Sequence, residues 1–431
     1  MIERLTLSER DKKNIWHPYT QMKLADLPIA IVRGEGAHLF DDANKKYIDA
    51  VSSWWVNVHG HAHPHIAKKI FSQLQTLEHV IFAGFTHAPA VELSERLLNK
   101  LPSNQQKIFF SDNGSTAVEV ALKMAFQFWS NKNKPRKKII AFAEAYHGDT
   151  FGAMSVSARS AFTAPFFSFL FDVIFIDIPT KGNETKVITQ LKNAIQENKN
   201  DIAAFIFEPL LQGTAGMKIY EAAALDELIK ICKQAEIITI ADEVMTGFGR
   251  TGKFFATDYC TEKADIFCLS KGLTGGTMAM GITSCVQFIY DAFLSDDKLK
   301  TFFHGHSYTA NPVACAAALA SMDIFDEIDT WKNIQRIEKS HLKFLEIIKD
   351  NTHIKNARCI GTVVAVDLQT EKSTSYFNTI RDKAYNYFLG KGVLLRPLGN
   401  IIYIMPPYCI TNEDLQYVYH CIEKFITEEL I

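Results

Sequence analysis

Residues Ile237–Gly276 read IITIADEVMTGFGRTGKFFATDYCTEKADIFCLSKGLTGG. The stretch holds two short apolar runs, Ile237–Ala241 and Ile266–Leu269, and each is followed by a charged side chain and glycines. Apolar runs of this length, bounded by such loops, are typical of strands buried in a sheet. Asp242 follows the first run and Lys271 the second. The pattern therefore predicts two buried strands with a carboxylate and an amine at their C-terminal ends.

The same pattern extends outward from this stretch, over about residues 107 to 290. Short β-branched runs alternate with helical patterns, which predicts an α/β fold with a mostly parallel sheet covered by helices. The expected strands are Lys107–Phe110, Ile139–Phe142, Val173–Ile176, Ile202–Phe207, Ile237–Ala241, Ile266–Leu269 and Ile282–Val286. The expected helices are Ser115–Trp129, Glu184–Glu197 and Glu221–Lys233. Such sheets bind ligands at the C-terminal ends of their strands.

The pattern changes beyond about residue 330, where a charged helix, Trp331–Lys349, leads into a strand at Thr362–Leu368. A last helix begins at Glu413, so we expect a smaller α+β domain here. The first 55 residues contain hairpin-like runs and no long helix, and we expect them to pack with that domain. The expected division is residues 1–55 as the N-terminal segment, 56–325 as the large domain and 326–431 as the small domain.

The composition excludes several classes of protein. The 431 residues include 46 Lys and Arg against 48 Asp and Glu, and the net charge of −2 favours neither nucleic acid nor a membrane surface as a partner. The N-terminus lacks the apolar core of a secretory signal, and no run reaches the roughly 18 apolar residues of a membrane helix. The eight cysteines are scattered, which is typical of reduced thiols. We expect a cytoplasmic protein.

Asp242 and Lys271 form the strongest chemical signal. A desolvated lysine can form an imine with a carbonyl compound. Pyridoxal phosphate also needs a carboxylate against its pyridinium nitrogen, because the protonated ring is the electron sink. The pair therefore predicts a pyridoxal phosphate site at these strand ends. Taken alone, Lys271 would be an exposed loop lysine, and Asp242 a helix N-cap or an ion-pair partner of Arg250.

Two further segments supply other parts of such a site. Ser111–Ala117 lies between an expected strand and a long helix, whose first N–H groups are free to bind phosphate, and Gly114 lets the ligand come close. Tyr146 follows the strand Ile139–Phe142, and its ring could stack on the cofactor. Without a ligand, the two segments would be a capped helix and a turn.

Several segments resemble class III aminotransferases, a family of pyridoxal phosphate enzymes with fold type I. They are Asp242–Gly252, Ser270–Gly276, and Glu208-Pro209 with Gln212-Gly213. Other segments resemble the members of that family that make 7,8-diaminononanoate in biotin biosynthesis. They are Trp16–Met22, Ser52–Trp55, Tyr146–Gly152, Leu395–Asn400 and Tyr403–Tyr408. The resemblance runs from about residue 14 to the C-terminus, and these latter segments are much more discriminating than the Lys and Asp motifs.

The resemblance implies roles on the cofactor side of the site. Lys271 would form the internal imine and move the proton between the substrate and the cofactor. Asp242 would pair with the ring nitrogen, and Tyr146 would stack on the ring. Gly114 and Ser115 would hold the phosphate.

It also implies the substrates. The keto acceptor, 8-amino-7-oxononanoate, is a long apolar chain ending in a carboxylate. We therefore expect its site to have an aromatic slot for the chain and a cation, far from the reactive lysine, for the carboxylate. Tyr19, Trp54 and Trp55 are the expected slot, with Tyr19 also catalytic, and Arg396 is the expected carboxylate ligand. The amino donor implied is S-adenosylmethionine, with lysine as the alternative.

Segment Phe303–Pro312 departs from the family pattern, in which many members carry Gly-Pro-Thr. In the family, that Thr reaches the cofactor phosphate of the neighbouring subunit, so the resemblance implies a homodimer. Gly305 is then expected near the substrate, and His306 and Ser307 at the cofactor. Thr309 is the alternative to Ser307 for the phosphate contact.

The four histidines at positions 59, 61, 63 and 65 suggest a rival, a metal-dependent hydrolase. Alternate histidines could share one face of an extended segment and ligate a metal, but adjacent carboxylates and cysteines are missing. Another alternative is a class III aminotransferase acting on an ω-amine, which would lack the Trp pair and the Arg396 segment. A binding protein with a vestigial aminotransferase fold would not need Lys271 and Asp242.

Overall fold

A computed structural model describes residues 5–370 and 378–430, and its centre is a seven-stranded sheet. The strand order is β4-β12-β11-β10-β7-β5-β6, and β12 runs in the opposite direction to the other six strands. The strands are β4 (Gln105–Ser111), β5 (Lys138–Phe142), β6 (Val173–Ile176), β7 (Ile202–Phe207), β10 (Ile238–Asp242), β11 (Ile266–Leu269) and β12 (Gly281–Val286). The expected α/β fold with a mostly parallel sheet is confirmed.

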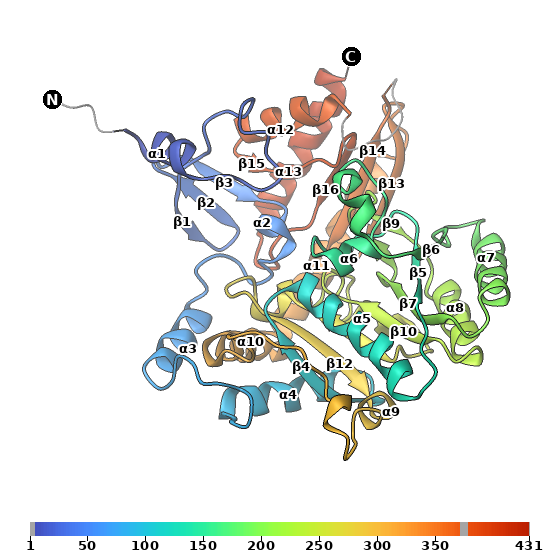
Figure 1. Cartoon of the computed structure of the whole chain (residues 1–431). Helices are drawn as coiled ribbons and strands as arrows, with labels where there is room; N and C mark the ends of the chain where they lie inside the picture. Colours follow the sequence, from blue (N-terminus) through green and yellow to red (C-terminus); the bar gives the residue numbers. More distant parts are fainter. Residues whose placement is uncertain (1–4, 371–377, 431) are drawn as a thin grey trace.

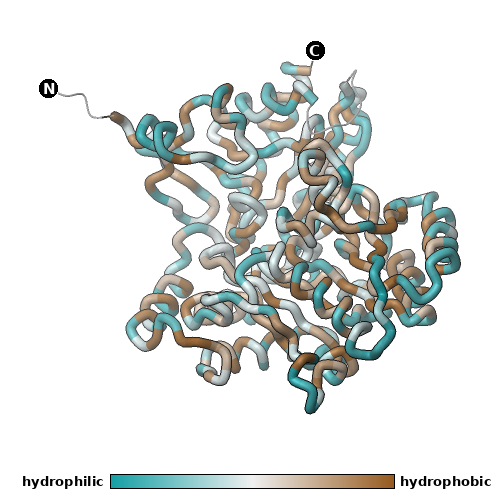
Figure 2. The backbone as a smooth tube through the Cα atoms, in the orientation of Figure 1, coloured by the Kyte–Doolittle hydropathy of each residue, from teal (hydrophilic) through white to brown (hydrophobic). Residues whose placement is uncertain are grey.

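The sheet is buried on both faces because alternate side chains enter two different cores. In β5, Ile140 and Phe142 belong to one apolar cluster, and Ile139 and Ala141 to the other. Helix α5 (Gly114–Asn131) lies across the second face and packs on β11 and β12 (Figure 1). The first core receives α4 (Ala88–Lys100), α7 (Glu184–Glu197) and α8 (Ala222–Gln234). In Figure 2 the outlying helices alternate between hydrophilic and hydrophobic colours, as helices with one buried face do.

Two further sheets, of four and of three strands, lie outside this large sheet. One contains β1 (Ile31–Glu35), β2 (His38–Asp41), β3 (Lys46–Asp49) and β15 (Val393–Leu394), and the other contains β13 (Ile354–Ile360), β14 (Val363–Leu368) and β16 (Ile401–Ile404). Since β15 pairs in parallel with β3, the N-terminal strands lie beside the C-terminal part of the chain (Figure 1). Helices α11 (Ile328–Ile348), α12 (Ile380–Gly390) and α13 (Asn412–Lys424) accompany these sheets. The division at residues 55 and 325 stays a prediction.

The remaining helices and short strands connect these parts. They are α1 (Leu7–Asn14), α2 (Ser52–Trp55), α3 (Pro64–Leu74), α6 (Phe151–Ser155), α9 (Gln287–Asp291), α10 (Pro312–Asp326), β8 (Leu211–Gln212) and β9 (Lys218–Ile219). Helix α10 packs against α3 and α4.

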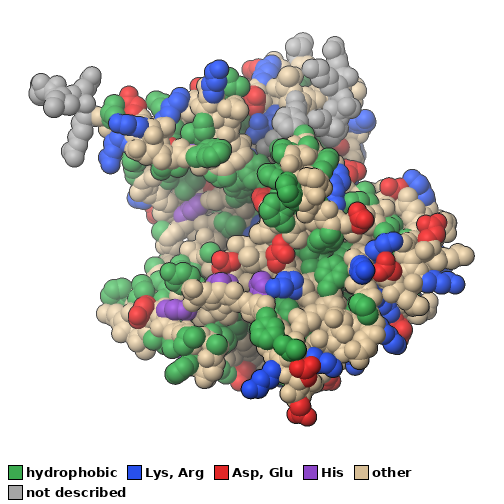
Figure 3. All heavy atoms as spheres, in the orientation of Figure 1, with side chains coloured by type: hydrophobic (Ala, Val, Ile, Leu, Met, Phe, Trp, Pro, Cys, Tyr) green, Lys and Arg blue, Asp and Glu red, His purple; other side chains and the backbone are tan. Residues whose placement is uncertain are grey.

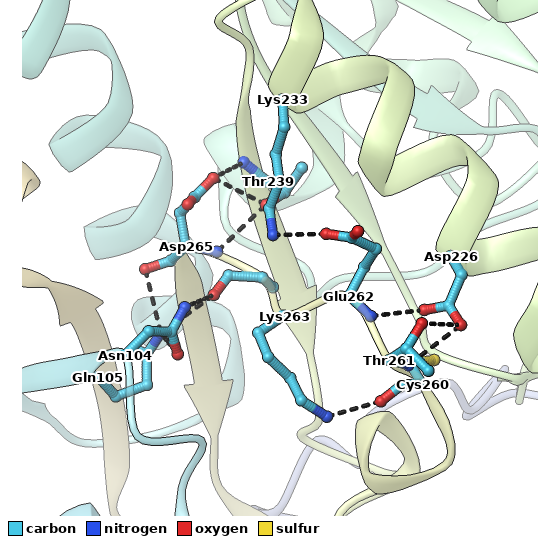
Figure 4. A network of polar contacts seen from close by, with 11 residues as sticks. Asn104, Gln105, Asp226, Lys233, Thr239, Cys260, Thr261, Glu262, Lys263 and Asp265 are labelled. Carbon is cyan, nitrogen blue, oxygen red and sulfur yellow. Dashed lines mark hydrogen bonds and ion pairs between the residues drawn. The ribbon is translucent and has the colours of Figure 1, made fainter.

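A polar network fixes the N-terminal ends of β10 and β11 (Figure 4). The carboxylate of Asp265 accepts hydrogen bonds from the backbone N–H and the hydroxyl of Thr239, at 2.9 and 2.8 Å. Gln105 donates to the carbonyl oxygens of Ala264 and Asp265. These bonds join β4, β10 and β11, so the opposite ends of β10 and β11 are held in register as well.

Across residues 5–370 and 378–430, no helix is long and apolar enough to cross a membrane. Figure 3 shows acidic and basic side chains interspersed on the visible face, with no large area of a single sign.

Candidate active site

A cavity of about 600 Å³ lies at the C-terminal ends of the parallel strands. Its lining includes six of the residues expected from the sequence: Trp55, Gly114, Ser115, Tyr146, Asp242 and Lys271. Apolar side chains complete the wall, among them Val244, Met245, Met278 and Met280. Five of the six expected residues lie at or shortly after the ends of β4, β5, β10 and β11, so the order of the sheet brings them together, and Trp55 comes from α2.

Lys271 presents an amine with a lowered proton affinity. It follows β11 with left-handed backbone angles (φ 46°), and its Nζ lies 4.9 Å from the centroid of the Trp55 ring. Burial lowers the pKa of Lys271 to about 8, although the carboxylates of Asp242 and Glu208 oppose the shift. At pH 7 the Lys271 amine is then neutral and nucleophilic in roughly a tenth of the molecules, a far larger fraction than for an exposed lysine.

Asp242, the last residue of β10, is held on both of its oxygens. His147 Nδ1 donates to Oδ2 at 2.6 Å, and the backbone N–H of Val244 donates to Oδ1 at 3.1 Å. Arg250 does not pair with it, because that guanidinium donates to the carbonyl oxygen of Pro406 at 2.8 Å. The alternative reading of Asp242 as the partner of Arg250 is therefore wrong.

The second carboxylate of the Asp-Glu pair, Glu243, turns away from the cavity. It accepts hydrogen bonds from the Thr246 and Thr257 hydroxyls and from the N–H groups of Ala256 and Thr257. Burial raises its pKa to about 7 despite these donors. Its position identifies Glu243 as a structural group beneath the site.

The start of α5 forms a cradle for an anion. Asn113 caps the helix by accepting from Thr116 N–H, and among the described residues the N–H groups of Gly114 and Ser115 have no acceptor. A Cβ at position 114 would lie 2.7 Å from a methyl carbon of Val244, and one at position 148 would lie 2.0 Å from Ser115 Oγ. Both glycines are therefore required for the close packing of this cradle, which faces the cavity.

Glu208, at the end of β7, is a wall residue whose part in the site the sequence did not show. It is buried and accepts from the N–H groups of Tyr146 and Gly213, at 3.0 and 3.1 Å. Burial raises its pKa to about 7. It thus fixes the backbone that carries the Tyr146 ring. Desolvation, followed by hydrogen bonding to Tyr19, raises the pKa of the Tyr146 hydroxyl, so that group stays protonated.

A line of contacts leads from the cavity to Arg396. Asp149 lines the cavity and accepts from the Tyr19 hydroxyl at 2.6 Å. The Tyr19 ring lies edge-on to Trp54 at 5.5 Å, and the Arg396 guanidinium lies 4.6 Å from the Trp54 ring centroid. In the described part of the chain, no carboxylate forms an ion pair with Arg396. Tyr19, Trp54 and Arg396 themselves lie outside the cavity lining.

The segment holding Gly305, His306 and Ser307 does not line the cavity of its own chain. Its turn is closed by the Thr309 hydroxyl, which donates to the His306 carbonyl oxygen at 2.8 Å. Ser307 is exposed to solvent, whereas Thr309 is partly buried.

The histidine run is divided among separate partners. His59 contacts Ser321 Oγ at 2.9 Å, His61 contacts Asp49 and His65 contacts Asp323. Within residues 5–370 and 378–430, no group of three His, Cys, Asp or Glu side chains could hold a metal ion. The described histidines of this run therefore do not form the metal site that the hydrolase hypothesis requires.

The groups at the cavity fit pyridoxal phosphate. The Lys271 amine can bond the aldehyde covalently, the Asp242 carboxylate can accept a hydrogen bond from the protonated ring nitrogen, and the cradle at Gly114 and Ser115 can bind the phosphate. The observation that favours this fit is the pair of free N–H groups in a cradle that a Cβ would fill.

Comparison with known proteins agrees with this site. The family model "Aminotransferase class-III" matches residues 19–426. An adenosylmethionine-8-amino-7-oxononanoate aminotransferase of Synechococcus elongatus is 45% identical over 423 residues, covering 96% of this chain and 99% of the relative. The crystal structure of the enzyme with the same name from Methanocaldococcus jannaschii covers 98% of each chain, with 36% identity and a TM-score of 0.93. An amine transaminase from an uncultivated Pseudomonas species, solved with pyridoxal phosphate bound, has a TM-score of 0.89 at 29% identity, covering 95% of this chain and 97% of that one. This chain belongs to the class III aminotransferases, which use pyridoxal phosphate as cofactor.

Proposed function

We propose that the chain transfers an amino group from S-adenosylmethionine to 8-amino-7-oxononanoate, giving 7,8-diaminononanoate for biotin biosynthesis. The relatives of Synechococcus elongatus and Methanocaldococcus jannaschii carry both compounds in their names. The alternative keeps the acceptor and takes lysine as the donor.

The guanidinium of Arg396, which forms no ion pair within residues 5–370 and 378–430, is the observation that carries the acceptor assignment. It lies on the Trp54 ring at the end of the line of contacts from the cavity through Asp149 and Tyr19. A chain with a ketone at one end and a carboxylate at the other needs an apolar path and a cation separated from the reactive amine. A guanidinium binds a carboxylate in a bidentate manner, and the partly exposed aromatic rings suit the methylene chain.

Different residues of the chain transfer the proton, hold the charge of the ring nitrogen and exclude water. Pyridoxal phosphate, when bound, supplies an aldehyde for covalent attachment of amines and a ring that withdraws electrons. The Lys271 amine is the group that can take a proton from the substrate Cα and return it, because its pKa of about 8 lets it exist in both forms. Asp242 holds a positive charge on the ring nitrogen, and His147 and Val244 keep its oxygens in place. Trp55 and the methionines exclude water.

We also propose a homodimer located in the cytoplasm. Gly305, His306 and Ser307 lie outside the cavity of their own chain, which is the position needed for a loop that reaches the site of a partner. The eight cysteines are free and mostly buried, as in proteins of a reducing compartment.

The visible absorption spectrum of the purified protein tests the reaction. We expect a band from bound cofactor that bleaches with S-adenosylmethionine and returns with 8-amino-7-oxononanoate, with 7,8-diaminononanoate found by mass spectrometry. Bleaching with lysine instead would support the alternative donor. A spectrum that does not return with the keto acid would contradict the acceptor.

Replacing Arg396 tests the carboxylate assignment. We expect Arg396→Ala to raise the acceptor KM by about tenfold or more, because a charge-assisted pair is lost, with little change in the cofactor band. Arg33→Ala is the matched control, since Arg33 also lies over an aromatic ring, that of Phe40, on a strand that contributes no residue to the cavity lining. An unchanged acceptor KM in Arg396→Ala would show that another group binds the carboxylate.

A further inference from the structure

The short helix α2 (Ser52–Trp55) is a kinked turn, in which three residues have a φ in the left-handed range and none of them is glycine. The angle φ is 50° at Ser52, 59° at Ser53 and 67° at Trp55. A positive φ is unfavourable for a residue with a Cβ. Such turns persist only where contacts with the surrounding structure stabilise them. The question is therefore what holds this one.

The turn sends two consecutive tryptophans to different parts of the site. Trp55 is buried, its Nε1–H donates to the Tyr403 hydroxyl at 2.9 Å, and its ring lines the cavity beside Lys271. Trp54 is 41% exposed and lies between Tyr19 and Arg396. Because the bond to Tyr403 holds Trp55 from outside the turn, a change in the turn would displace Trp54 before it affects the cavity wall.

Asp49, the last residue of β3, holds this turn with a fully buried carboxylate. Its Oδ1 accepts from the N–H groups of Val51 and Ser53, at 3.2 and 2.9 Å. Its Oδ2 accepts from the Ser53 N–H at 2.7 Å and from the Ser53 hydroxyl at 3.2 Å. Both oxygens thus act on the residue at the centre of the turn.

His61 requires Asp49 to be an acceptor. Its Nε2 lies 2.9 Å from Asp49 Oδ2, and its Nδ1 lies 3.0 Å from the amide nitrogen of Asn57. Because that amide nitrogen can only donate, His61 carries its proton on Nε2 and donates it to Asp49. All the groups around the carboxylate are donors, so a side-chain amide at this position would set one N–H group against another.

We propose that Asp49 is a positioning residue for the acceptor substrate, and that its carboxylate holds the left-handed turn that brings Trp54 to Arg396. The inference rests on the proposed function, since the slot beside Arg396 is assigned to the keto acid. The groups that fit the cofactor follow β4, β10 and β11 in the large sheet, so Asp49 acts on the acceptor and leaves cofactor binding intact.

The variant Asp49→Asn tests this role because it keeps the size of the side chain and removes one acceptor oxygen. We expect the acceptor KM to rise by about tenfold or more. The cofactor band, and its rate of bleaching by S-adenosylmethionine alone, should change by less than about threefold, an effect of under 1 kcal/mol. Asp41→Asn is the matched control, because Asp41 also accepts from two backbone N–H groups, in a turn that contributes nothing to the cavity lining.

Restoring the turn without the carboxylate gives the decisive comparison. Glycine adopts left-handed angles without strain, so Asp49→Asn combined with Ser53→Gly should recover most of the acceptor KM. No recovery, or an equal loss in the donor half-reaction and in the cofactor band, would overturn the proposal in favour of a general structural role. Should Asp49→Asn not fold, Ser53→Val displaces the turn with the carboxylate in place, and an unchanged acceptor KM in that variant overturns the proposal.

A readout without substrate separates this proposal from the proposed function. If the native enzyme does not use 8-amino-7-oxononanoate, the proposed function fails, whatever Asp49 does. A crystal structure of Asp49→Asn then decides: residues Ser52–Trp55 leaving the left-handed region support the holding role, and an unchanged turn overturns it.

Discussion

The Lys271 amine lies against the Trp55 ring and is buried with the carboxylates of Asp242 and Glu208 as neighbours. The carboxylates favour the charged amine and burial favours the neutral one. Burial prevails, because the pKa falls to about 8 from an ordinary value near 10.5. The protonated form therefore dominates below pH 8 and the nucleophilic form above it.

Capture of the cofactor by the apoprotein should follow this titration. We expect the rate of covalent capture of pyridoxal phosphate to rise about tenfold per pH unit up to about pH 8 and then to level off, because only the neutral amine attacks. The growth of the visible absorbance in a stopped-flow instrument, from pH 6 to 10, measures it. A rate that still rises steeply to pH 10 would mean that burial does not depress the pKa.

A lysine substitution provides the control for this experiment. Lys271→Ala should fold, as judged by circular dichroism, but form no covalent band and show no turnover. Lys253→Ala, which removes a lysine that lies over the Tyr259 ring outside the cavity lining, should behave as the native protein does. Turnover in Lys271→Ala would remove this residue from the mechanism.

The position of a site residue that follows a strand could be predicted from the sequence. The contacts that a residue makes with a neighbouring strand's residues could not. Asp242, Lys271 and Tyr146 come shortly after apolar runs, so their place at the sheet edge can be read from the pattern. The bonds of His147 to Asp242 and of Glu208 to Tyr146 N–H depend on which strands are neighbours. Strand order has no local signal, so the resemblance marks the segments that hold these two residues but not the bonds that they form.

At the scale of elements, the buried strands were the most predictable. The expected strands at Val173–Ile176, Ile202–Phe207 and Ile266–Leu269 have the observed bounds, because each apolar run has a polar residue directly before and after it. The turn Ser52–Trp55 was not foreseen. Its residues with positive φ are not glycines, and the contacts that hold it come from β3 and β16.

The start of α5 gives a prediction at this scale. Gly114→Ala should weaken pyridoxal phosphate binding by about tenfold or more, because the new Cβ would lie 2.7 Å from a Val244 methyl and push into the cradle. The helix itself should not suffer, since alanine is the better helix former. Equilibrium titration of the apoprotein measures the dissociation constant.

The matched variant distinguishes crowding from a loss of flexibility. Gly114→Ala combined with Val244→Ala removes the methyl groups that the new Cβ meets, so it should regain most of the affinity. If the double variant binds no better than the single one, the crowding at Val244 is not the cause.

At the scale of the whole molecule, the proposed dimer predicts that inactive chains can complement each other. Ser307→Asp should impair the neighbouring site by setting a negative charge against the phosphate. Mixed with Lys271→Ala, it should restore about a quarter of the native activity, because half of the dimers are mixed and each has one intact site. The activity of chains refolded together at equal concentration measures this.

Two outcomes would revise this view. No activity in the mixture, with activity lost in each parent, would mean that each chain completes its own site. Complementation by Thr309→Asp but not by Ser307→Asp would assign the phosphate contact to Thr309.

The pairing of β3 with β15 also has a consequence for the order in which the protein can be made. Residues Lys46–Asp49 leave the ribosome about 345 residues before Val393–Leu394, and their sheet cannot be completed until that strand is made. The large sheet needs nothing beyond Val286, so its strands can assemble during translation. A growing chain would thus acquire a pocket for its cofactor well before Trp54 and Arg396 could meet around a substrate.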